Sequence, residues 1–152
     1  MHKPAQYQAY SLATRTVAKT RQVVMLYDGA IRFLQQAKSA IESHKIEERF
    51  NLLQRASEVV IGLQSSIDFD TGGEVAHTLH RFYTDVSMRI LAINFKDSEG
   101  IELCTGLIND LKQMRDIWDG IDKTLNKPAD VPVIEQAAPQ PGKPDPTVSL
   151  SA

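Results

Sequence analysis

The feature that most constrains this chain is the distribution of its prolines. Six of the seven prolines lie at or after residue 128, and the remaining one is Pro4. The stretch from Ala5 to Lys127 contains none, although the usual frequency of about 5% would place roughly six there. Because proline lacks an amide donor and clashes with the preceding helical turn, its absence over this length predicts nearly continuous helix.

Four segments of this stretch carry apolar residues at intervals of three or four, which is the spacing of one helical face. The first segment runs from about Thr16 to Ser43, and the second begins near Ile46. The four stripes are Val23, Leu26, Ala30, Leu34, Ala37 and Ile41; Phe50, Leu53, Ala56, Val60, Leu63 and Ile67; Val75, Leu79, Phe82, Val86, Ile90 and Ile93; and Cys104, Leu107, Leu111, Met114, Trp118, Ile121 and Leu125. Each helix would be marginal alone in water, so we expect the four stripes to pack together.

Short polar segments separate the four helices. Residues 43–45 and 97–99 are polar, and residues 70–74 combine two glycines with a Thr71-x-x-Glu74 capping-box spacing. Short connections favour antiparallel neighbours, so the sequence predicts an all-α, antiparallel up-down four-helix bundle over residues 16–125.

Two segments lie outside this expected bundle. Residues 1–15 carry Tyr7, Tyr10 and Leu12 among small and polar residues, which predicts a flexible N-terminal arm that can dock. Residues 126–152 are rich in proline, alanine, glutamine and serine, which predicts an extended and mostly disordered tail.

Composition excludes several classes of function. The chain has 17 Lys+Arg and 19 Asp+Glu residues, so no broad positive field attracts nucleic acid or anionic lipid. No apolar run approaches the length of a membrane span, and the N-terminus lacks the apolar core of a secretory signal. A lone cysteine, Cys104, excludes an internal disulfide framework and a cysteine-rich zinc site. We expect a cytoplasmic protein without a nucleic-acid partner or membrane insertion.

Two motifs near the start of the third helix could carry chemistry. Glu74-x-x-His77 has the spacing found in di-iron bundles, but such a site needs a second copy and facing glutamates. His77 also points roughly 180° away from the apolar stripe, so we expect it to face solvent and to bind no metal in the core.

The second motif, at residues 76–80, resembles the signature of histidine phosphotransfer domains. In that reading His77 would be reversibly phosphorylated beside a stabilising cation, although His80 and Arg81 replace the usual lysine and glycine. Phosphotransfer through His77 therefore stands as the alternative function. The sequence has no phosphate-binding loop, nucleophile elbow or paired zinc motif, so we expect no other enzymatic activity and no cofactor.

A glycine inside the first helix directs attention to its surroundings. Gly29 costs about 1 kcal/mol relative to alanine in a helix, and close packing of a neighbouring helix over it would be one reason to keep it. The surrounding segment, MLYDGAIRFL at residues 25–34, resembles the first-helix signature of the flagellin export chaperones, the FliS family. Further resemblances follow in order: Gly72-Gly73-Glu74-Val75-Ala76, Phe82-Tyr83, Asn94, and Met114-Arg115-x-x-Trp118.

This resemblance implies a cytoplasmic, ATP-free chaperone that binds the C-terminal segment of unpolymerised flagellin and prevents premature assembly before type III export. It also implies an export-gate protein as a further candidate partner, and it leaves the oligomeric state open. The residues expected to bind flagellin or to shape its groove are Tyr7, Tyr10, Leu12, Tyr27, Asp28, Gly29, Tyr83 and Asn94. The N-terminal arm would occupy part of that groove until flagellin displaces it.

Overall fold

Four helices make up the fold. The structure, a computed structural model, describes residues 5–96 and 98–126, with side chains from Lys19 onward. The helices are α1 (Ala5–Glu42), α2 (Ile46–Ser65), α3 (Phe69–Phe95) and α4 (Gly100–Asn126). The predicted all-α bundle is confirmed. Within the described residues, no helix combines the length and the hydropathy needed to cross a membrane.

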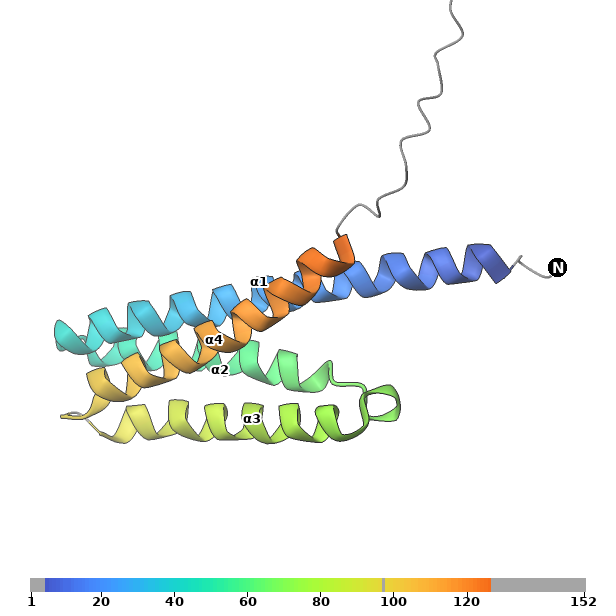
Figure 1. The fold of residues 1–152 in the computed structure, drawn as a ribbon. Coiled ribbons are helices and arrows are strands. Elements are labelled where there is room, and N and C mark those ends of the chain that lie inside the picture. The colour runs from blue at the N-terminus through green and yellow to red at the C-terminus, as the bar shows by residue number, and fades with distance from the viewer. Residues whose placement is uncertain (1–4, 97, 127–152) are drawn as a thin grey trace, which may run out of the picture.

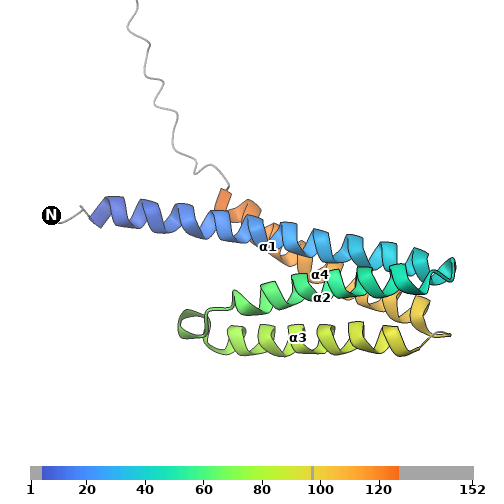
Figure 2. The ribbon, with the colours of Figure 1, turned by 180° about the vertical axis from the view of Figure 1, so that it is seen from behind.

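The helices form a ring in which α1 packs against α2 and α4, and α3 packs against α2 and α4. Among the described residues, the backbones of α1 and α3, and those of α2 and α4, do not come close to each other. Side chains still meet across the bundle, as Tyr27 of α1 and Tyr83 of α3 do. The α3–α4 interface is the least extensive of the four. Figure 1 shows why: α4 follows α1 along its length, while its C-terminal half moves away from α3. The view from behind shows the same divergence (Figure 2). We call this region the diverging end.

The core lies where all four helices run together. Most members of the predicted stripes are buried there, including Leu34, Leu53, Val86 and Leu107. The stripe predicted for α3 is wrong at its start, because Val75 is 66% exposed while Ala76 is buried. Both residues are apolar, and the divergence of α4 leaves the Val75 side of α3 uncovered.

The N-terminal half of α1 differs from the expected boundary. The helix begins at Ala5 rather than near Thr16, since the intervening residues contain no glycine or proline and include good helix formers. In Figure 1, α1 continues beyond the ends of the other helices. The side chains of Tyr7, Tyr10 and Leu12 are not among those described, so their role as a docking arm stays a prediction. The predicted tail from residue 127 onward also lies outside the described residues.

The connection between α2 and α3 has a different cap from the one predicted. Asp68, rather than Thr71, caps α3: its Oδ1 accepts hydrogen bonds from the amides of Asp70 at 3.0 Å and Thr71 at 3.3 Å. Hydrogen bonds from Thr71 and from these amides hold the pKa of Asp68 below its usual value. Gly73 then interrupts the helix with a φ of 53°, which L side chains rarely adopt. The predicted helix break at the glycine pair is therefore present just after the first turn of α3.

Candidate functional site

An apolar groove of about 360 Å³ opens at the diverging end. Its walls come from all four helices, and the apolar lining includes Val23 and Leu26 on α1, Leu63 on α2, Val75 and Leu79 on α3, and Trp118 on α4. Val75 is 66% exposed and Leu26 is 37% exposed, so apolar surface here is accessible to a partner. Lys19, Gln22, Asp68 and Thr71 add polar groups to the lining. We call this feature the groove.

Two buried tyrosines lie beside the groove. Tyr83 is among its lining residues, and the Tyr27 hydroxyl donates a hydrogen bond of 2.9 Å to the Tyr83 hydroxyl. Their ring centroids are 6.2 Å apart. Burial raises the pKa of both phenols above the ordinary value of 10.0. Both residues were predicted to bind flagellin or to shape its groove. The structure places them beside this groove with their side chains buried.

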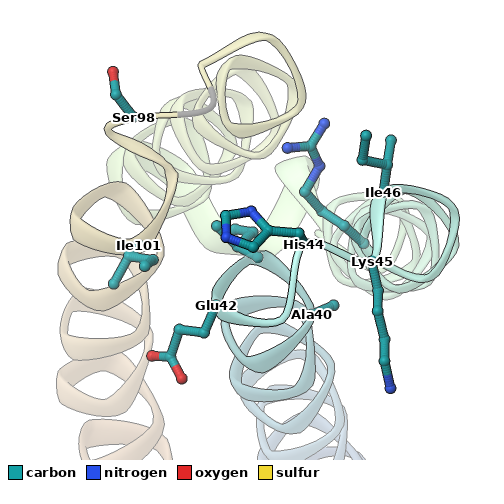
Figure 3. A pocket seen from close by; sticks show the side chains of 9 residues that line it. Ala40, Glu42, His44, Lys45, Ile46, Ser98 and Ile101 are labelled. Carbon is teal, nitrogen blue, oxygen red and sulfur yellow. The ribbon is translucent and has the colours of Figure 1, made fainter.

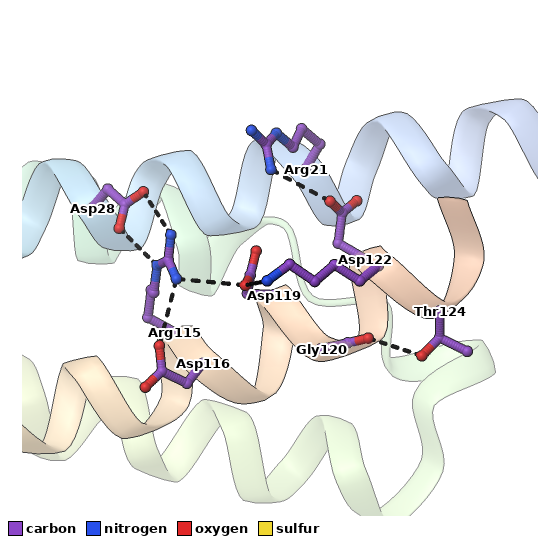
Figure 4. A network of polar contacts seen from close by, with 9 residues as sticks. Arg21, Asp28, Arg115, Asp116, Asp119, Gly120, Asp122 and Thr124 are labelled. Atoms are coloured by element: carbon purple, nitrogen blue, oxygen red, sulfur yellow. Dashed lines mark hydrogen bonds and ion pairs between the residues drawn. The ribbon is translucent and has the colours of Figure 1, made fainter. Parts of the chain in front are cut away.

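An ion-pair network joins the middle of α1 to α4. The guanidinium of Arg115 contacts both carboxylate oxygens of Asp28, at 2.8 Å and 3.4 Å, and it also lies 3.6 Å from Asp119 (Figure 4). The hydrogen bond to Asp28 raises the pKa of Arg115. Lys123, at 2.9 Å, lowers the pKa of Asp119. Exposed ion pairs are individually weak, so this network orients α4 more than it stabilises the fold.

A buried carboxylate makes a second polar contact between α1 and α4. Asp122 is only 3% exposed, and its carboxylate accepts hydrogen bonds from Thr20 Oγ1 and Asn126 Nδ2, both at 3.0 Å. Arg21 Nη1 lies 3.6 Å from the same carboxylate (Figure 4). We call the Asp28–Arg115 and Thr20–Asp122 contacts together the α1–α4 clamp. Since the clamp keeps the C-terminal half of α4 beside α1, it keeps that half away from α3 and leaves the groove open.

Gly29 and Asn94, two further predicted site residues, lie elsewhere. Gly29 is buried in α1, but a Cβ added there would meet nothing within 4 Å. The expectation that a neighbouring helix packs closely over Gly29 is therefore wrong. Asn94 lies near the opposite end of α3 from the groove, where its carbonyl oxygen accepts a 3.3 Å hydrogen bond from Arg49.

The residues considered for chemistry form no reactive centre. His77 is exposed, as expected, and its ring lies 5.3 Å from that of Phe69. Cys104 is buried, and burial raises the pKa of its thiol to about 11, so it is a poor nucleophile at neutral pH. Among the described side chains, no three histidine, cysteine or acidic groups come together as metal ligands would.

A second pocket, of about 570 Å³, lies at the other end of the bundle from the groove (Figure 1). Figure 3 shows the side chains that line it. It is bordered by the α1–α2 turn and the start of α4, including His44, Arg49, Ser98 and Ile101. His44 closes α1 with a φ of 57°, and the Lys45 amide donates to the Ala40 carbonyl in the manner of a Schellman motif. This pocket mixes charged and apolar groups, whereas the groove is mainly apolar.

The sequence did not identify the residues that line the groove, because their apolar members had been assigned to the buried core. Leu26, Leu79 and Trp118 were placed in the buried stripes, but they border a space that only the divergence of α4 opens. It also missed Asp122. Its position four residues after Trp118, on the apolar side of α4, was the available signal for a buried polar contact.

Comparisons with known proteins agree on one family. The family model described as "Flagellar protein FliS" matches residues 1–125. The flagellar secretion chaperone FliS of Campylobacter jejuni is 32% identical over 113 residues, which cover 74% of this chain and 87% of that protein. FliSB of Pseudomonas aeruginosa is 29% identical over 119 residues, covering 76% and 92%. FliS of Salmonella typhimurium is 29% identical over 93 residues, covering 60% and 69%.

Proposed function

Because the chain belongs to the FliS family of flagellar secretion chaperones, we propose that its groove holds the C-terminal segment of unpolymerised flagellin. Members of this family are cytoplasmic proteins and are not enzymes. The chain therefore acts before export, as a binding protein that needs no cofactor chemistry. The family assignment leaves the alternative of phosphotransfer through His77 without support.

The observation that carries this proposal is the gathering of accessible apolar side chains in one groove. Val75 and Leu26 are exposed on two different helices, and Trp118 borders the same space from a third. An apolar helix or extended segment can dock into such a groove and remove its own apolar face from water. A flagellin segment covered in this way cannot pair with other subunits, so premature assembly is prevented.

The surrounding structure gives the groove a fixed shape. The Tyr27–Tyr83 pair supports one wall, and the α1–α4 clamp holds Trp118 at a distance from α3. Preorganisation of this kind lowers the ordering cost of binding. The predicted residues Tyr27, Tyr83 and Asp28 thus act by shaping the groove, while Val23, Leu26, Val75, Leu79 and Trp118 make the contacts.

The test is co-expression with flagellin from the same organism, followed by gel filtration. We expect a stable complex with full-length flagellin and none with flagellin that lacks its C-terminal segment. A complex that forms equally well without this segment would contradict the proposal.

A matched pair of variants tests the location. Val75→Asp places a charge in the groove, and Met88→Asp places the same charge on the same helix at a residue of similar exposure, 62%, that does not line the groove. We expect Val75→Asp to weaken flagellin binding about tenfold, or ~1.4 kcal/mol, measured by calorimetry. Met88→Asp should bind as the wild type does. Equal losses in both variants would place the binding surface elsewhere.

The export-gate protein remains a further proposed partner. It is tested by asking whether immobilised export-gate protein retains the chaperone alone, the complex with flagellin, or neither. Retention of neither would contradict this part of the proposal.

A further inference from the structure

The C-terminus of α4 lies at the diverging end of the molecule (Figure 1), and the residues that line the groove belong to the same end. Trp118 borders the groove, and α4 ends eight residues later, at Asn126. At 1.5 Å per residue, these eight residues span about 12 Å along the helix axis. A further 26 residues follow Asn126, since the chain ends at residue 152. Whatever conformation they adopt, they start close to an accessible apolar surface.

The first part of this C-terminal segment contains a short apolar sequence. Residues 131–134 are Val-Pro-Val-Ile, and Val131 is five residues after Asn126. An extended chain covers about 3.3–3.6 Å per residue, so five residues reach roughly 17 Å. This reach exceeds the 12 Å or so from the end of α4 back to the level of Trp118. Residues 131–134 can therefore return to the groove without any change in the helices.

We propose that residues 131–134 occupy the groove of the same chain when flagellin is absent. Val131, Val133 and Ile134 cover apolar surface contributed by Leu26, Val75 and Trp118. This occupation is argued from the geometry and does not depend on flagellin binding. Competition between the segment and flagellin for the groove is a consequence that rests on the function proposed above.

The chemistry of the segment suits the groove. Proline has a fixed φ and disfavours the helical conformation of the residue before it, so Pro132 limits the freedom that this segment can lose on docking. Asp130 and Glu135 flank the apolar residues. Lys19, which is exposed and lines the groove, supplies a charge of opposite sign. Asp68, which also lines the groove, has the same sign as these flanks, so the match lies mainly in the apolar residues, with Lys19 available to one acidic flank.

The covalent connection makes a weak contact sufficient. Four residues bury little surface and would bind poorly as a free peptide, but a short covalent connection gives an effective concentration on the order of millimolar. The segment then covers the groove for a substantial part of the time and still yields to a longer ligand. We expect competition to weaken flagellin binding by about twofold to tenfold.

The test uses Trp118, the only tryptophan in the chain, as a reporter inside the groove. The full-length variant Val131→Ser/Val133→Ser/Ile134→Ser removes the apolar segment. Ala137→Ser/Ala138→Ser is the matched control in the same C-terminal region. We expect the first variant to shift tryptophan emission to longer wavelength, because Trp118 becomes more hydrated, and the control to match the wild type. Identical emission in all three proteins would overturn the proposal.

Two other occupants have distinct outcomes in the same assay. Docking of the segment from a second copy would make the emission difference disappear on dilution, which overturns occupation within one chain. Occupation by the N-terminal residues would instead give a red shift in Tyr7→Ser/Tyr10→Ser and none in the 131–134 variant, which also overturns the proposal.

Flagellin binding then separates this proposal from the proposed function. The 131–134 variant should bind the C-terminal segment of flagellin about twofold to tenfold more tightly than the wild type. An emission shift without binding of flagellin by any of the proteins would leave the occupied groove in place and contradict the chaperone function at this site. Tight binding of flagellin, with identical emission from the wild type and the variants, would contradict occupation of the groove by residues 131–134 and support the chaperone function.

Discussion

Helix α4 has two neighbours, and its two interfaces differ along their length. Against α1 it makes polar contacts from Arg115 to Asp122, so the two helices stay together over the C-terminal half of α4. Against α3 the bond between Arg89 and Asp110, at 2.6 Å, lies in the N-terminal half of α4. Beyond it α4 moves away from α3 (Figure 1), and the groove lies in this region. The comparison teaches that polar contacts on one side of a helix can create an apolar site on its other side.

The largest effect should come from the buried end of the α1–α4 clamp. Asp122→Ala removes a buried carboxylate that accepts hydrogen bonds from the Thr20 hydroxyl and the Asn126 amide. We expect a loss of about 2–3 kcal/mol in the free energy of unfolding, measured by urea denaturation. Asp116→Ala, at an exposed carboxylate on the same helix, is the control and should change it by less than about 0.5 kcal/mol. Similar losses in both variants would show that the buried Asp122 carboxylate contributes no more to stability than an exposed carboxylate does.

The tyrosine pair tests the support beside the groove. Tyr27→Phe removes the donor to the buried Tyr83 hydroxyl, so we expect a loss of about 1–2 kcal/mol in the free energy of unfolding. The double variant Tyr27→Phe/Tyr83→Phe removes both hydroxyls and should be less destabilised than the sum of the single variants. Additive losses in this cycle would mean that the two hydroxyls do not depend on each other.

The same pair predicts a loss of stability at alkaline pH. The folded pKa values of Tyr27 and Tyr83 lie above the ordinary value of 10.0, so their contribution is complete below that pH and falls as the pH rises past it. Each phenol then lowers the free energy of unfolding by up to about 1.4 kcal/mol per pH unit. The Cys104 thiol begins to lower the stability once the pH passes its ordinary pKa of 9.0, because its folded pKa is raised to about 11. Urea denaturation between about pH 8 and about pH 11 measures this decline, which should be smaller in the double phenylalanine variant.

The exposed part of the clamp should have the smallest effect. Arg115→Ala removes the contacts with Asp28 and Asp119, and we expect it to cost about 0.5 kcal/mol at low ionic strength. In about 1 M salt the difference from the wild type should disappear, because exposed charges are screened. A difference that persists in high salt would indicate that the Arg115 side chain packs against α1 rather than attracting its carboxylate.

Much of the fold follows from local sequence. The start of α2 at Ile46 and the break at Gly72-Gly73 were predicted because short polar turns and glycines act on their immediate neighbours. The start of α1 was placed too late, because a polar but helix-compatible segment lacks the periodic stripe that marks a packed helix. The sequence could not tell which of Val75 and Ala76 is buried, since both are apolar and they are adjacent.

The shape of the groove could not be predicted, because it depends on contacts between residues that are distant in sequence. Thr20 and Asp122 are 102 residues apart, and Asp28 and Arg115 are 87 apart, so no local pattern reveals that these residues meet. The resemblance to a family drew attention to Tyr27, Asp28 and Tyr83 without giving their contacts. The structure supplies those contacts: Tyr27 and Tyr83 form a buried pair, and Asp28 belongs to the α1–α4 clamp.

Asp122 also fixes the register of two long helices. The apolar stripes of α1 and α4 repeat every three or four residues, so sliding one helix by a single turn would preserve much of their hydrophobic contact. Such a slip would bring the carboxylate toward Val24, which is buried and apolar, and away from the Thr20 hydroxyl. Burying a carboxylate without a donor is costly, so Asp122 disfavours this shifted alignment, which the stripes alone would allow.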